Sequence, residues 1–572
     1  MYHQVFDPIG HSLGLSTIFA VLPLLTIFVL LGVLRLKAQW AALIALLVAL
    51  IVAVAVYGMP VGQALSGAGE GAAFGLFPIM WIVVNAIWVY NLTVSTGHFD
   101  VLRRSFGAVS DDQRIQAVII AFCFGALLEA LAGFGTPVAI SAVMLIALGF
   151  GPLKAAAVAL VANTAPVAFG AIAVPITTLA KVTGLPVHDI GATVGRQTPI
   201  LAVVVPLVLV FMVDGTRGLR QTWPAALLGG VVFGVAQFAA SNYLTVELTD
   251  IVASLASAAA IVAFLRVWQP REILTGERLS EAAVSDRLAK ASGGTPDKTT
   301  GTGTTGTGAT ATATRGGDGT DHPARDSKLE VLRAYAPYLI IIVVFSLAQI
   351  GPIKRFLAKG ATSFKWPGLH IQGPDGKSPS SVTYAFGWLS AAGTLLLISG
   401  LITMFVLKVG AARAVRAYGR TLDQLKWAIF TVAAVLALAY VMNLSGQTVT
   451  IGQWLAGAGG LFAFLSPVLG WLGVAVTGSD TSSNALFGTL QVAAAKQSGL
   501  SQVLLASANS SGGVLGKMIS PQNLAIGAAA VGMAGEEGQL FRKVFGWSLL
   551  FLLLICILVY LQSTPVLSWM LP

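Results

Sequence analysis

The segment Ala162-Asn-Thr-Ala-Pro-Val-Ala-Phe-Gly-Ala-Ile-Ala-Val-Pro175 has a counterpart near the other end of the chain, Ala508-Asn-Ser-Ser-Gly-Gly-Val-Leu-Gly-Lys-Met-Ile-Ser-Pro521. Ala, Asn, Gly and Pro recur at the same spacing in both copies, and Thr164 aligns with Ser510. Each copy follows a Gly-centred break, Gly133-Phe-Gly-Thr-Pro137 in the first case and Gly478-Ser-Asp-Thr-Ser482 in the second. Paired helix-breaking polar segments in two halves of an apolar chain are typical of the binding site of a secondary transporter.

The composition indicates a protein that uses lipid as its solvent. Of the 572 residues, 56% are hydrophobic and 10% are charged, and the mean hydropathy is +0.82. This is more apolar surface than a soluble core can bury. We therefore expect an all-α polytopic membrane protein with roughly 11–14 membrane segments, some of them incomplete, since a helix satisfies its own backbone in lipid. The clearest apolar runs are 13–34, 40–57, 201–213, 251–265, 338–350, 395–407 and 544–561.

Basic residues beside the apolar runs indicate the orientation. They cluster at Arg35 and Lys37, at Arg103, Arg104 and Arg114, at Arg217 and Arg220, at Lys408, Arg413, Arg416, Arg420 and Lys426, and at Arg542 and Lys543. Placing these clusters in the cytoplasm follows the positive-inside rule and leaves both chain ends outside. One basic loop, 354–377, falls on the outer side, and its Pro, Gly and Trp366 indicate a structured loop. The net charge of +10 is therefore interpreted as a topology signal and not as a nucleic-acid footprint.

Other features of the chain carry no chemistry of their own. The run 13–34 has no basic stretch before it and no small-residue cleavage site after it, so we expect a retained first helix and not a secretory signal. Cys123 and Cys556 lie in apolar segments and lack the partner spacing of a metal or redox pair. No cofactor or metal is expected, and the scattered His residues argue against an enzyme.

The composition divides the chain into two halves. Residues 269–330 are rich in Thr, Gly, Ala and charge, with Thr299-Thr-Gly-Thr-Gly-Thr-Thr-Gly-Thr-Gly308 at the centre. Such a stretch cannot bury enough apolar surface to offset its ordering entropy, so we expect a disordered cytoplasmic linker. It separates an N-terminal membrane half, 1–268, from a C-terminal half, 331–572, and each half contains one copy of the repeat.

Glu129 is an isolated carboxylate in an apolar helix just before the first break. A charge at membrane depth costs a few kcal/mol, so an ionisable residue there is a functional candidate by default. Burial would move its titration toward the range where it exchanges protons. The alternative is that Glu129 pairs with a buried Lys or Arg or lies near an interface.

The two breaks resemble anion sites. Gly133, Gly135 and Pro137 stop one helix and start another, Thr136 adds a hydroxyl, and the free N–H groups of the new helix favour a carboxylate. The second break offers more polar side chains for the same purpose, namely Gly478, Ser479, Thr481, Ser482 and Asn484. Asp480 is a helix N-cap, a cation ligand or a second titrating group, and the cap is the favoured interpretation.

The repeated Asn-Thr and Asn-Ser pairs complete the predicted site. Asn163, Thr164, Asn509 and Ser510 can satisfy an unwound backbone and can equally bind a carboxylate or a hydroxyl; the alternative is that they join helices. Two basic residues lie in apolar sequence, Arg196 and Lys517. Either could neutralise an anion, or could instead pair with Glu129 or Asp480.

The chain resembles a known family at these residues. The matching motifs are Gly133-Phe-Gly-Thr-Pro-Val-Ala-Ile140, Asn163-Thr-Ala-Pro-Val-Ala-Phe-Gly170, Val194-Gly-Arg-Gln197, Leu469-Gly-Trp-Leu-Gly473, Thr477-Gly-Ser-Asp-Thr-Ser-Ser-Asn-Ala-Leu-Phe487 and Gly512-Gly-Val-Leu-Gly-Lys-Met-Ile-Ser-Pro-Gln522. They are similar to those of the bacterial L-lactate permease family. The resemblance implies proton-coupled uptake of L-lactate, D-lactate or glycolate across the bacterial inner membrane. It also implies inverted repeats, re-entrant hairpins and elevator-type motion; the long Thr/Gly linker departs from the family pattern.

The resemblance and the residues together give a hypothesis for coupling. Glu129, or with less support Asp480, binds the proton, while the two break tips, Asn163 and Asn509 hold the substrate. A sodium-coupled carboxylate or gluconate-type carrier is the alternative. The expected partners are a monocarboxylate, the proton and the lipid bilayer; a homodimer stays open, and no nucleic acid is expected.

Overall fold

The computed structural model describes residues 1–34, 36–107, 109–133, 135–275, 327–348, 350–373, 376, 378–379, 382–533 and 536–572. Most of the predicted linker, 276–326, lies outside the described residues. Its borders are ordered, because the backbone at Leu274 bonds to Asp112 and Gln113 and a helix begins at Lys328.

Helices dominate the first half, in agreement with the expected all-α class. They are α1 (Leu13–Phe28), α2 (Ala38–Ala55), α3 (Val61–Phe74), α4 (Trp81–Ser95), α5 (His98–Gly107), α6 (Gln113–Gln116), α7 (Gly125–Ala132), α8 (Thr136–Ala147), α9 (Pro152–Ala162), α10 (Gly170–Thr183), α11 (Val187–Tyr243) and α12 (Thr249–Phe264). Short π or 3-10 turns interrupt the path at Val29–Val33, Gly75–Met80, Ala117–Phe124, Val167–Phe169 and Val246–Leu248.

The second half has the same character. Its helices are α14 (Lys328–Ala348), α15 (Gly351–Ala358), α16 (Ala392–Val406), α17 (Ala411–Ser445), α18 (Gln447–Leu455), α19 (Phe462–Thr477), α20 (Asp480–Ser498), α21 (Gln502–Gly516), α22 (Pro521–Ala530) and α23 (Glu537–Gln562). Tight turns lie at Ala456–Leu461, Lys517–Ile519 and Ser568–Met570. The basic loop between α15 and α16 is structured, since β2 (Ala361–Lys365) pairs antiparallel with β4 (Thr383–Gly387), and β3 (Ile371–Gln372) pairs parallel with β1 (Tyr2–His3).

The described residues contain nine helical stretches long and apolar enough to cross a membrane, or ten if the bent pair Pro152–Ala162 and Val167–Thr183 is one span. This is fewer than the segments expected from the sequence, and two features explain the difference. Helix α11 is broken at Asp214 and Gly215, whose φ and ψ angles are not helical, and consists of limbs 187–213 and 216–243. The two limbs pack against each other, since a Cβ atom at Gly230 would lie 2.7 Å from the carbonyl oxygen of Ala202. Three further apolar helices, α1, α8 and α16, are shorter than 18 residues.

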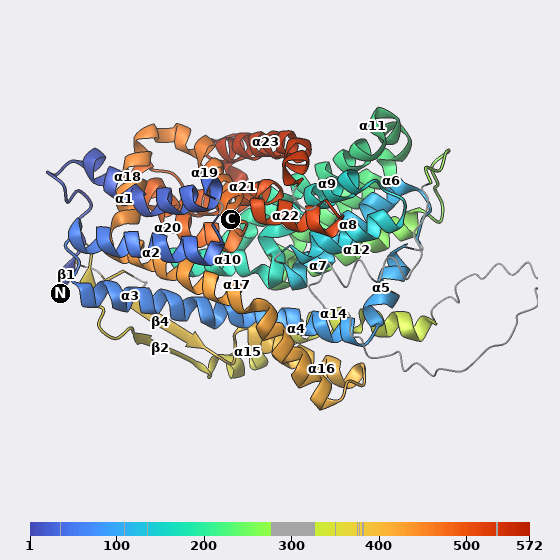
Figure 1. The fold of residues 1–572 in the computed structure, drawn as a ribbon, viewed down its shortest axis with the longest axis horizontal. Coiled ribbons are helices and arrows are strands. Elements are labelled where there is room, and N and C mark those ends of the chain that lie inside the picture. Colours follow the sequence, from blue (N-terminus) through green and yellow to red (C-terminus); the bar gives the residue numbers. More distant parts are fainter. Residues whose placement is uncertain are drawn as a thin grey trace, which may run out of the picture.

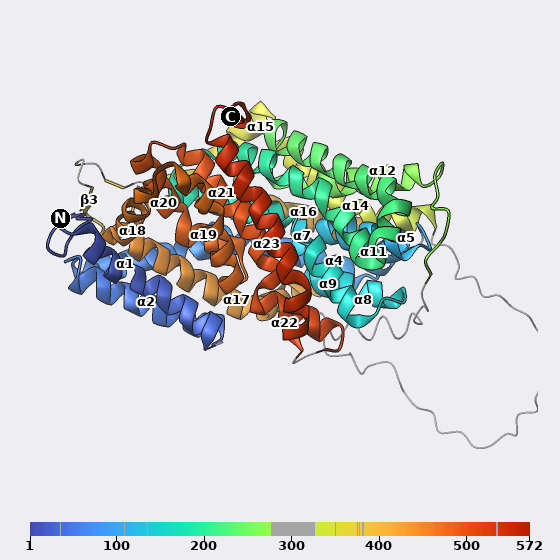
Figure 2. The same cartoon turned by 90° about the horizontal axis from the view of Figure 1, so that it is seen from above.

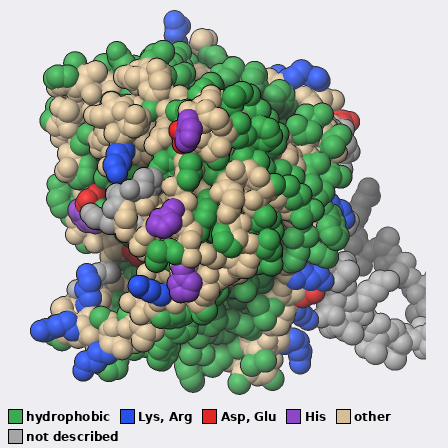
Figure 3. Space-filling model, turned by 90° about the vertical axis from the view of Figure 1, so that its left-hand side faces the viewer, with side chains coloured by type: hydrophobic (Ala, Val, Ile, Leu, Met, Phe, Trp, Pro, Cys, Tyr) green, Lys and Arg blue, Asp and Glu red, His purple; other side chains and the backbone are tan. Residues whose placement is uncertain are grey.

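The two halves interleave in space. Figure 1 shows α1 to α3 of the first half beside α17, α18 and α20 of the second, while α8, α9, α11 and α12 lie toward the other end. Helix α10 of the first half packs against α20 between them, and α22 of the second half packs against α8 and α9. In Figure 2, α23 crosses the molecule between these two groups. The surface is that of a protein in lipid: Figure 3 shows broad hydrophobic areas with small groups of Lys and Arg. Large apolar side chains such as Phe405 and Val415 are more than 70% exposed.

Candidate substrate and proton site

The first Gly-centred break is confirmed as a break between two helices. Helix α7 ends at Gly133, which has φ of +41°, and Gly135, with φ of +83°, precedes α8, whose first turn contains Pro137. A Cβ atom at Gly135 would lie 2.4 Å from the Cδ1 atom of Ile526. This left-handed backbone and this close approach require glycine, and they bring the first tip, including Thr136, against α22.

The second break corrects one prediction. Helix α19 ends at Gly478, which has φ of +74°, and α20 begins directly after Ser479. The N-cap is Ser479 and not Asp480, because the hydroxyl of Ser479 accepts a hydrogen bond from the backbone N–H of Ser482 at 3.2 Å. Asp480 is the first helical residue, and its side chain is thereby free to point into the protein.

The start of α22 lies between the two tips. A Cβ atom at Gly478 would be 2.7 Å from the side-chain oxygen of Gln522, and the carbonyl of Gly478 accepts a 3.5 Å bond from Asn523. The Oδ1 atom of the same Asn523 lies 3.3 Å from the Cβ position of Gly135. The breaks from the two halves of the chain therefore converge on one short segment.

Glu129 forms a buried ion pair with Lys517 of the other repeat. The Nζ atom of Lys517 is 2.6 Å from Oε1 of Glu129, and both side chains are less than 10% exposed. The Nδ2 group of Asn163 donates to the second carboxylate oxygen at 3.0 Å, while Oδ1 of Asn163 is buried without a partner. Of the alternatives that the sequence left open, the structure contains the Glu129 and Lys517 pair.

Asp480 has neutral hydrogen-bond partners. Its Oδ2 atom accepts from the hydroxyl of Ser510 at 2.6 Å and from the amide of Asn484 at 3.2 Å, while its Oδ1 atom is buried and unpaired. Asn509 donates to Asn484 at 2.9 Å and accepts from Gln491. Among the described residues no cation forms an ion pair with Asp480.

Glycines make room for both carboxylates. A Cβ atom at Gly170 would lie 2.8 Å from Oε1 of Glu129, and one at Gly513 would lie 2.3 Å from Oδ1 of Asp480. Neither glycine has a positive φ angle. The absence of a side chain at these two positions is therefore explained by the space that the carboxylates occupy. Helix α21 connects the partners of the two acids, because Ser510, which bonds to Asp480, lies within it and Lys517, which bonds to Glu129, follows its last residue. The two residues are about 10 Å apart along the helix axis.

The two copies of the repeat differ in where the helix stops. In the first copy α9 ends at Asn163 and the chain bends by 65° before α10. In the second copy α21 continues through Asn509 and Ser510 and ends only at Gly516, so the helix is not unwound at this Asn-Ser pair. The hydroxyl of Thr164 donates to the carbonyl of Val161 in its own turn, at 2.7 Å.

A strained turn follows the first copy. Ala171, Ile172 and Ala173 all have φ between +45° and +57° and form a left-handed turn that is buried in the protein. Each such L-residue costs roughly 1–2 kcal/mol, and strain of this kind persists where the surroundings enforce it. The turn lies against the first tip, because the Cβ atom of Ala171 is 3.5 Å from the Cβ position of Gly133.

Arg196 is not brought to this site. Its Nε atom donates to Asn242 at 2.9 Å and its Nη1 atom to the carbonyl of Met570 at 2.8 Å. The neighbouring Gln197 points the other way and accepts a 2.6 Å bond from Ser511 of α21. Consecutive helix residues point about 100° apart, so Gln197 points inward while Arg196 points away from the site.

Thr481 is half-buried on α20, beside the second tip.

Comparison with known proteins identifies the family. Residues 16–566 match the model of the L-lactate permease family. The chain belongs to the L-lactate permease family.

Three relatives in that family are similar to this chain over nearly their whole length. The chain is 43% identical to a glycolate permease of Escherichia coli (strain K12), over 98% of both chains. It is 42% identical to an L-lactate permease of Bacillus subtilis (strain 168), over 100% of this chain and 99% of the relative, and 41% identical to the L-lactate permease of Escherichia coli (strain K12), over 100% of both. The chain is thus a multi-pass permease of the bacterial membrane and not an enzyme.

In this L-lactate permease family member, the buried acids Asp250 and Glu70 and the α22 residue Asn523 are not among the residues predicted from the sequence. Asp250 is fully buried: Oδ1 accepts from Gln237 at 3.1 Å and Oδ2 has no partner. Glu70 in α3 is 1% exposed, and its Oε2 atom is unpaired. The rule that singled out Glu129, an acid within an apolar span, would have found both. Asn523 had no comparable signal, since its place between the tips comes from the fold.

Proposed function

We propose that the protein takes up L-lactate and related 2-hydroxymonocarboxylates, D-lactate and glycolate among them, by proton symport. The printed functions of its relatives, L-lactate and glycolate permeases, support this substrate class. The observation that carries the proposal is the buried pair of Glu129 and Lys517, which joins the two repeats beside two broken helices.

Substrate recognition would use Lys517, its neighbour Asn163 and the two helix breaks. The ammonium of Lys517 is a compact cation suited to a carboxylate. The unpaired Oδ1 atom of Asn163 can accept a hydrogen bond from a substrate hydroxyl at the adjacent carbon. The N-termini of α8 and α20 lie at the two tips, and the positive end of each helix dipole favours the same anion.

Coupling follows from the charge balance of the pair. While Glu129 is ionised, it neutralises Lys517, and an added substrate carboxylate would be an uncompensated negative charge in a buried site. When Glu129 takes a proton, Lys517 loses its counterion and the substrate replaces it. The loaded site then has the same net charge as the empty site, so proton and anion bind together.

The membrane potential favours a loaded site that carries no additional net charge. Moving one negative charge into a cell with a negative interior costs about 2.3 kcal/mol per 100 mV. Uptake of an anion with one proton moves no net charge, so it avoids this cost and draws on the pH gradient. Asp480 is the second candidate for the proton, because it is buried without a cation partner among the described residues.

Counterflow in proteoliposomes tests the function. Vesicles loaded with unlabelled L-lactate should accumulate external labelled L-lactate, and D-lactate and glycolate should compete while succinate should not. Uptake into unloaded vesicles should follow an imposed inward proton gradient in the absence of sodium. Absence of monocarboxylate counterflow would refute the substrate class, and uptake that needs sodium and ignores the pH gradient would refute the proton coupling.

A further inference from the structure

Arg196 has no anionic partner among the residues that the structure describes. Its two hydrogen bonds go to neutral oxygens, those of Asn242 and Met570. It lies on the first limb of α11, about 14 Å from the helix start at Val187. An arginine at such a depth in a membrane helix normally has a counter-charge or reaches the interface.

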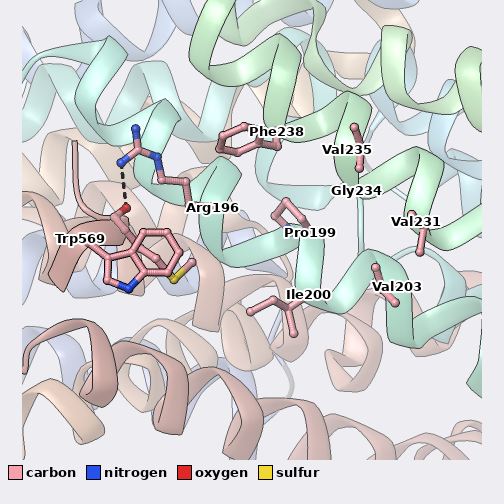
Figure 4. A pocket seen from close by; sticks show the side chains of 10 residues that line it. Arg196, Pro199, Ile200, Val203, Val231, Gly234, Val235, Phe238 and Trp569 are labelled. Atoms are coloured by element: carbon pink, nitrogen blue, oxygen red, sulfur yellow. Dashed lines mark hydrogen bonds between the residues drawn. The ribbon is translucent and has the colours of Figure 1, made fainter. Parts of the chain in front are cut away.

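A groove begins at this guanidinium and is otherwise apolar. It has a volume of about 540 Å³ and runs between the two limbs of α11, with Arg196 and Trp569 at one end (Figure 4). Its walls are apolar side chains, Pro199, Ile200 and Val203 on one limb and Val231, Val235 and Phe238 on the other. Gly234 forms the floor, since a Cβ atom there would lie 3.2 Å from the carbonyl of Pro199.

The walls of the groove face outward from the protein. Val235 is 63% exposed, and Ile200 and Val231 are each 39% exposed. In a helix that crosses the bilayer, side chains exposed in this way contact lipid. Trp569, which is 74% exposed beside Arg196, is the type of residue that gathers at the level of the lipid headgroups.

We propose that this groove binds an anionic phospholipid, whose phosphate contacts the guanidinium of Arg196 and one of whose acyl chains lies between the limbs of α11. Charge complementarity selects this occupant, because a guanidinium without a carboxylate partner is matched by a phosphate that can accept two parallel N–H bonds. The shape selects a chain, because the groove follows two helices and its described lining is apolar beyond Arg196 and the indole of Trp569. The bound lipid would hold together the two limbs and the C-terminal segment around Met570.

The test uses native mass spectrometry of the purified full-length protein with added dioleoylphosphatidylglycerol. Arg196→Gln should weaken binding of this lipid by about tenfold, the change expected from losing one charge-assisted contact. Val235→Trp keeps the arginine but fills the exposed groove, and it should weaken binding as well. Arg220→Gln, which removes an exposed arginine beyond the turn of α11, is the matched control and should bind as the wild type does.

Comparison of probes separates the headgroup from the chain. Dihexanoylphosphatidylglycerol and inorganic phosphate should bind much more weakly than the long-chain lipid. Dioleoylphosphatidylcholine, whose phosphate is balanced by its own choline cation, should bind more weakly than dioleoylphosphatidylglycerol and lose less affinity in Arg196→Gln. Unchanged binding of dioleoylphosphatidylglycerol in both Arg196→Gln and Val235→Trp would overturn the proposal. A disulfide-linked dimer formed by Val235→Cys in native membranes would also overturn it, because the groove would then be covered by a second copy.

Discussion

At the scale of single residues, the pair of Glu129 and Lys517 fits the proposed exchange of anions better than a role in stability. A buried ion pair gives little net stabilisation, because the desolvation of both charges offsets their attraction. Loss of one partner is costly, about 3–5 kcal/mol, because the other charge stays buried alone. A substrate anion that replaces one partner avoids this cost, which makes the pair suited to exchange.

Replacing Glu129 by Gln should separate binding from coupling. Lys517 then lacks its counterion at every pH and stays available to a carboxylate, while no proton is exchanged at position 129. We expect counterflow of L-lactate to remain in part and accumulation driven by a pH gradient to be lost. Asp423→Asn, at an exposed acid paired with Lys426, is the control. Wild-type pH dependence in Glu129→Gln would assign the proton to another acid, and Asp480→Asn would then be measured in the same way.

Replacing Lys517 should have a different effect from replacing its partner. Lys517→Met removes the cation that is proposed to hold the carboxylate, so both counterflow and gradient-driven uptake should fall by about 100-fold or more, the loss expected for a buried charge contact. The double variant Glu129→Gln with Lys517→Met restores neutrality. It should unfold at a higher temperature than Lys517→Met alone and still fail to transport. Recovery of counterflow in the double variant would contradict the role of Lys517.

At the scale of elements, glycines allow α19 and α21 to pack backbone against backbone. A Cβ atom at Gly470 would lie 1.9 Å from the carbonyl oxygen of Asn509, and one at Gly512 would lie 2.2 Å from the carbonyl oxygen of Pro467. Small residues at such a contact are the usual means of close helix association in membranes. The contact fixes the position of Asn509 and Ser510 along the axis of α21 relative to the tip at Gly478.

Gly470→Ala should therefore be destabilising. The added methyl group must push α21 away, at a cost of about 1–3 kcal/mol, and the melting temperature in detergent should fall. Gly546→Ala on α23 is the control, since nothing lies within 4 Å of its Cβ position, and there alanine should leave stability unchanged or raise it slightly. Equal melting temperatures for the two variants would show that the contact is looser than described.

At the scale of the whole molecule, one buried arginine joins three distant segments. Arg114, at 1% exposure, makes two hydrogen bonds to Asp112 and one to Asp214 at the turn of α11, and it donates to the carbonyl of Glu272 at 2.5 Å. Two clusters that the charge pattern assigned to the same side of the membrane, Arg114 and Arg217, are thereby neighbours. The segment leading to the linker is fixed at this side as well.

Arg114→Met should lower the free energy of unfolding by about 3–5 kcal/mol, because Asp112 stays buried without its cation. Arg217 also forms an ion pair, with Glu272, but both side chains are more than half exposed, so Arg217→Met should cost less than about 1 kcal/mol. Thermal unfolding of both variants in the same detergent measures the difference. A small effect of Arg114→Met would mean that Asp112 finds another partner.

The sequence predicted the helix breaks better than the partners of the polar residues. Gly133, Gly135 and Gly478 were recognisable because each precedes or follows an apolar run, and positive φ angles confirm them. The choice of Lys517 over Arg196 as the partner of Glu129 was not decidable, because it depends on which way α11 faces in the folded protein. The N-cap was misplaced by one residue, since Ser and Asp are equally good caps and only the inward partner Ser510 distinguishes them.

The separation of Glu129 from Lys517 by 388 residues has a consequence for synthesis. Ribosomes deliver the first repeat to the membrane long before the second, so the acid enters the bilayer while its lysine has not yet been translated. During that interval a proton is the simplest counterion for Glu129. The nascent first half would then pass through the protonated form that the proposed symport requires of Glu129, and it would give up that proton once Lys517 arrives.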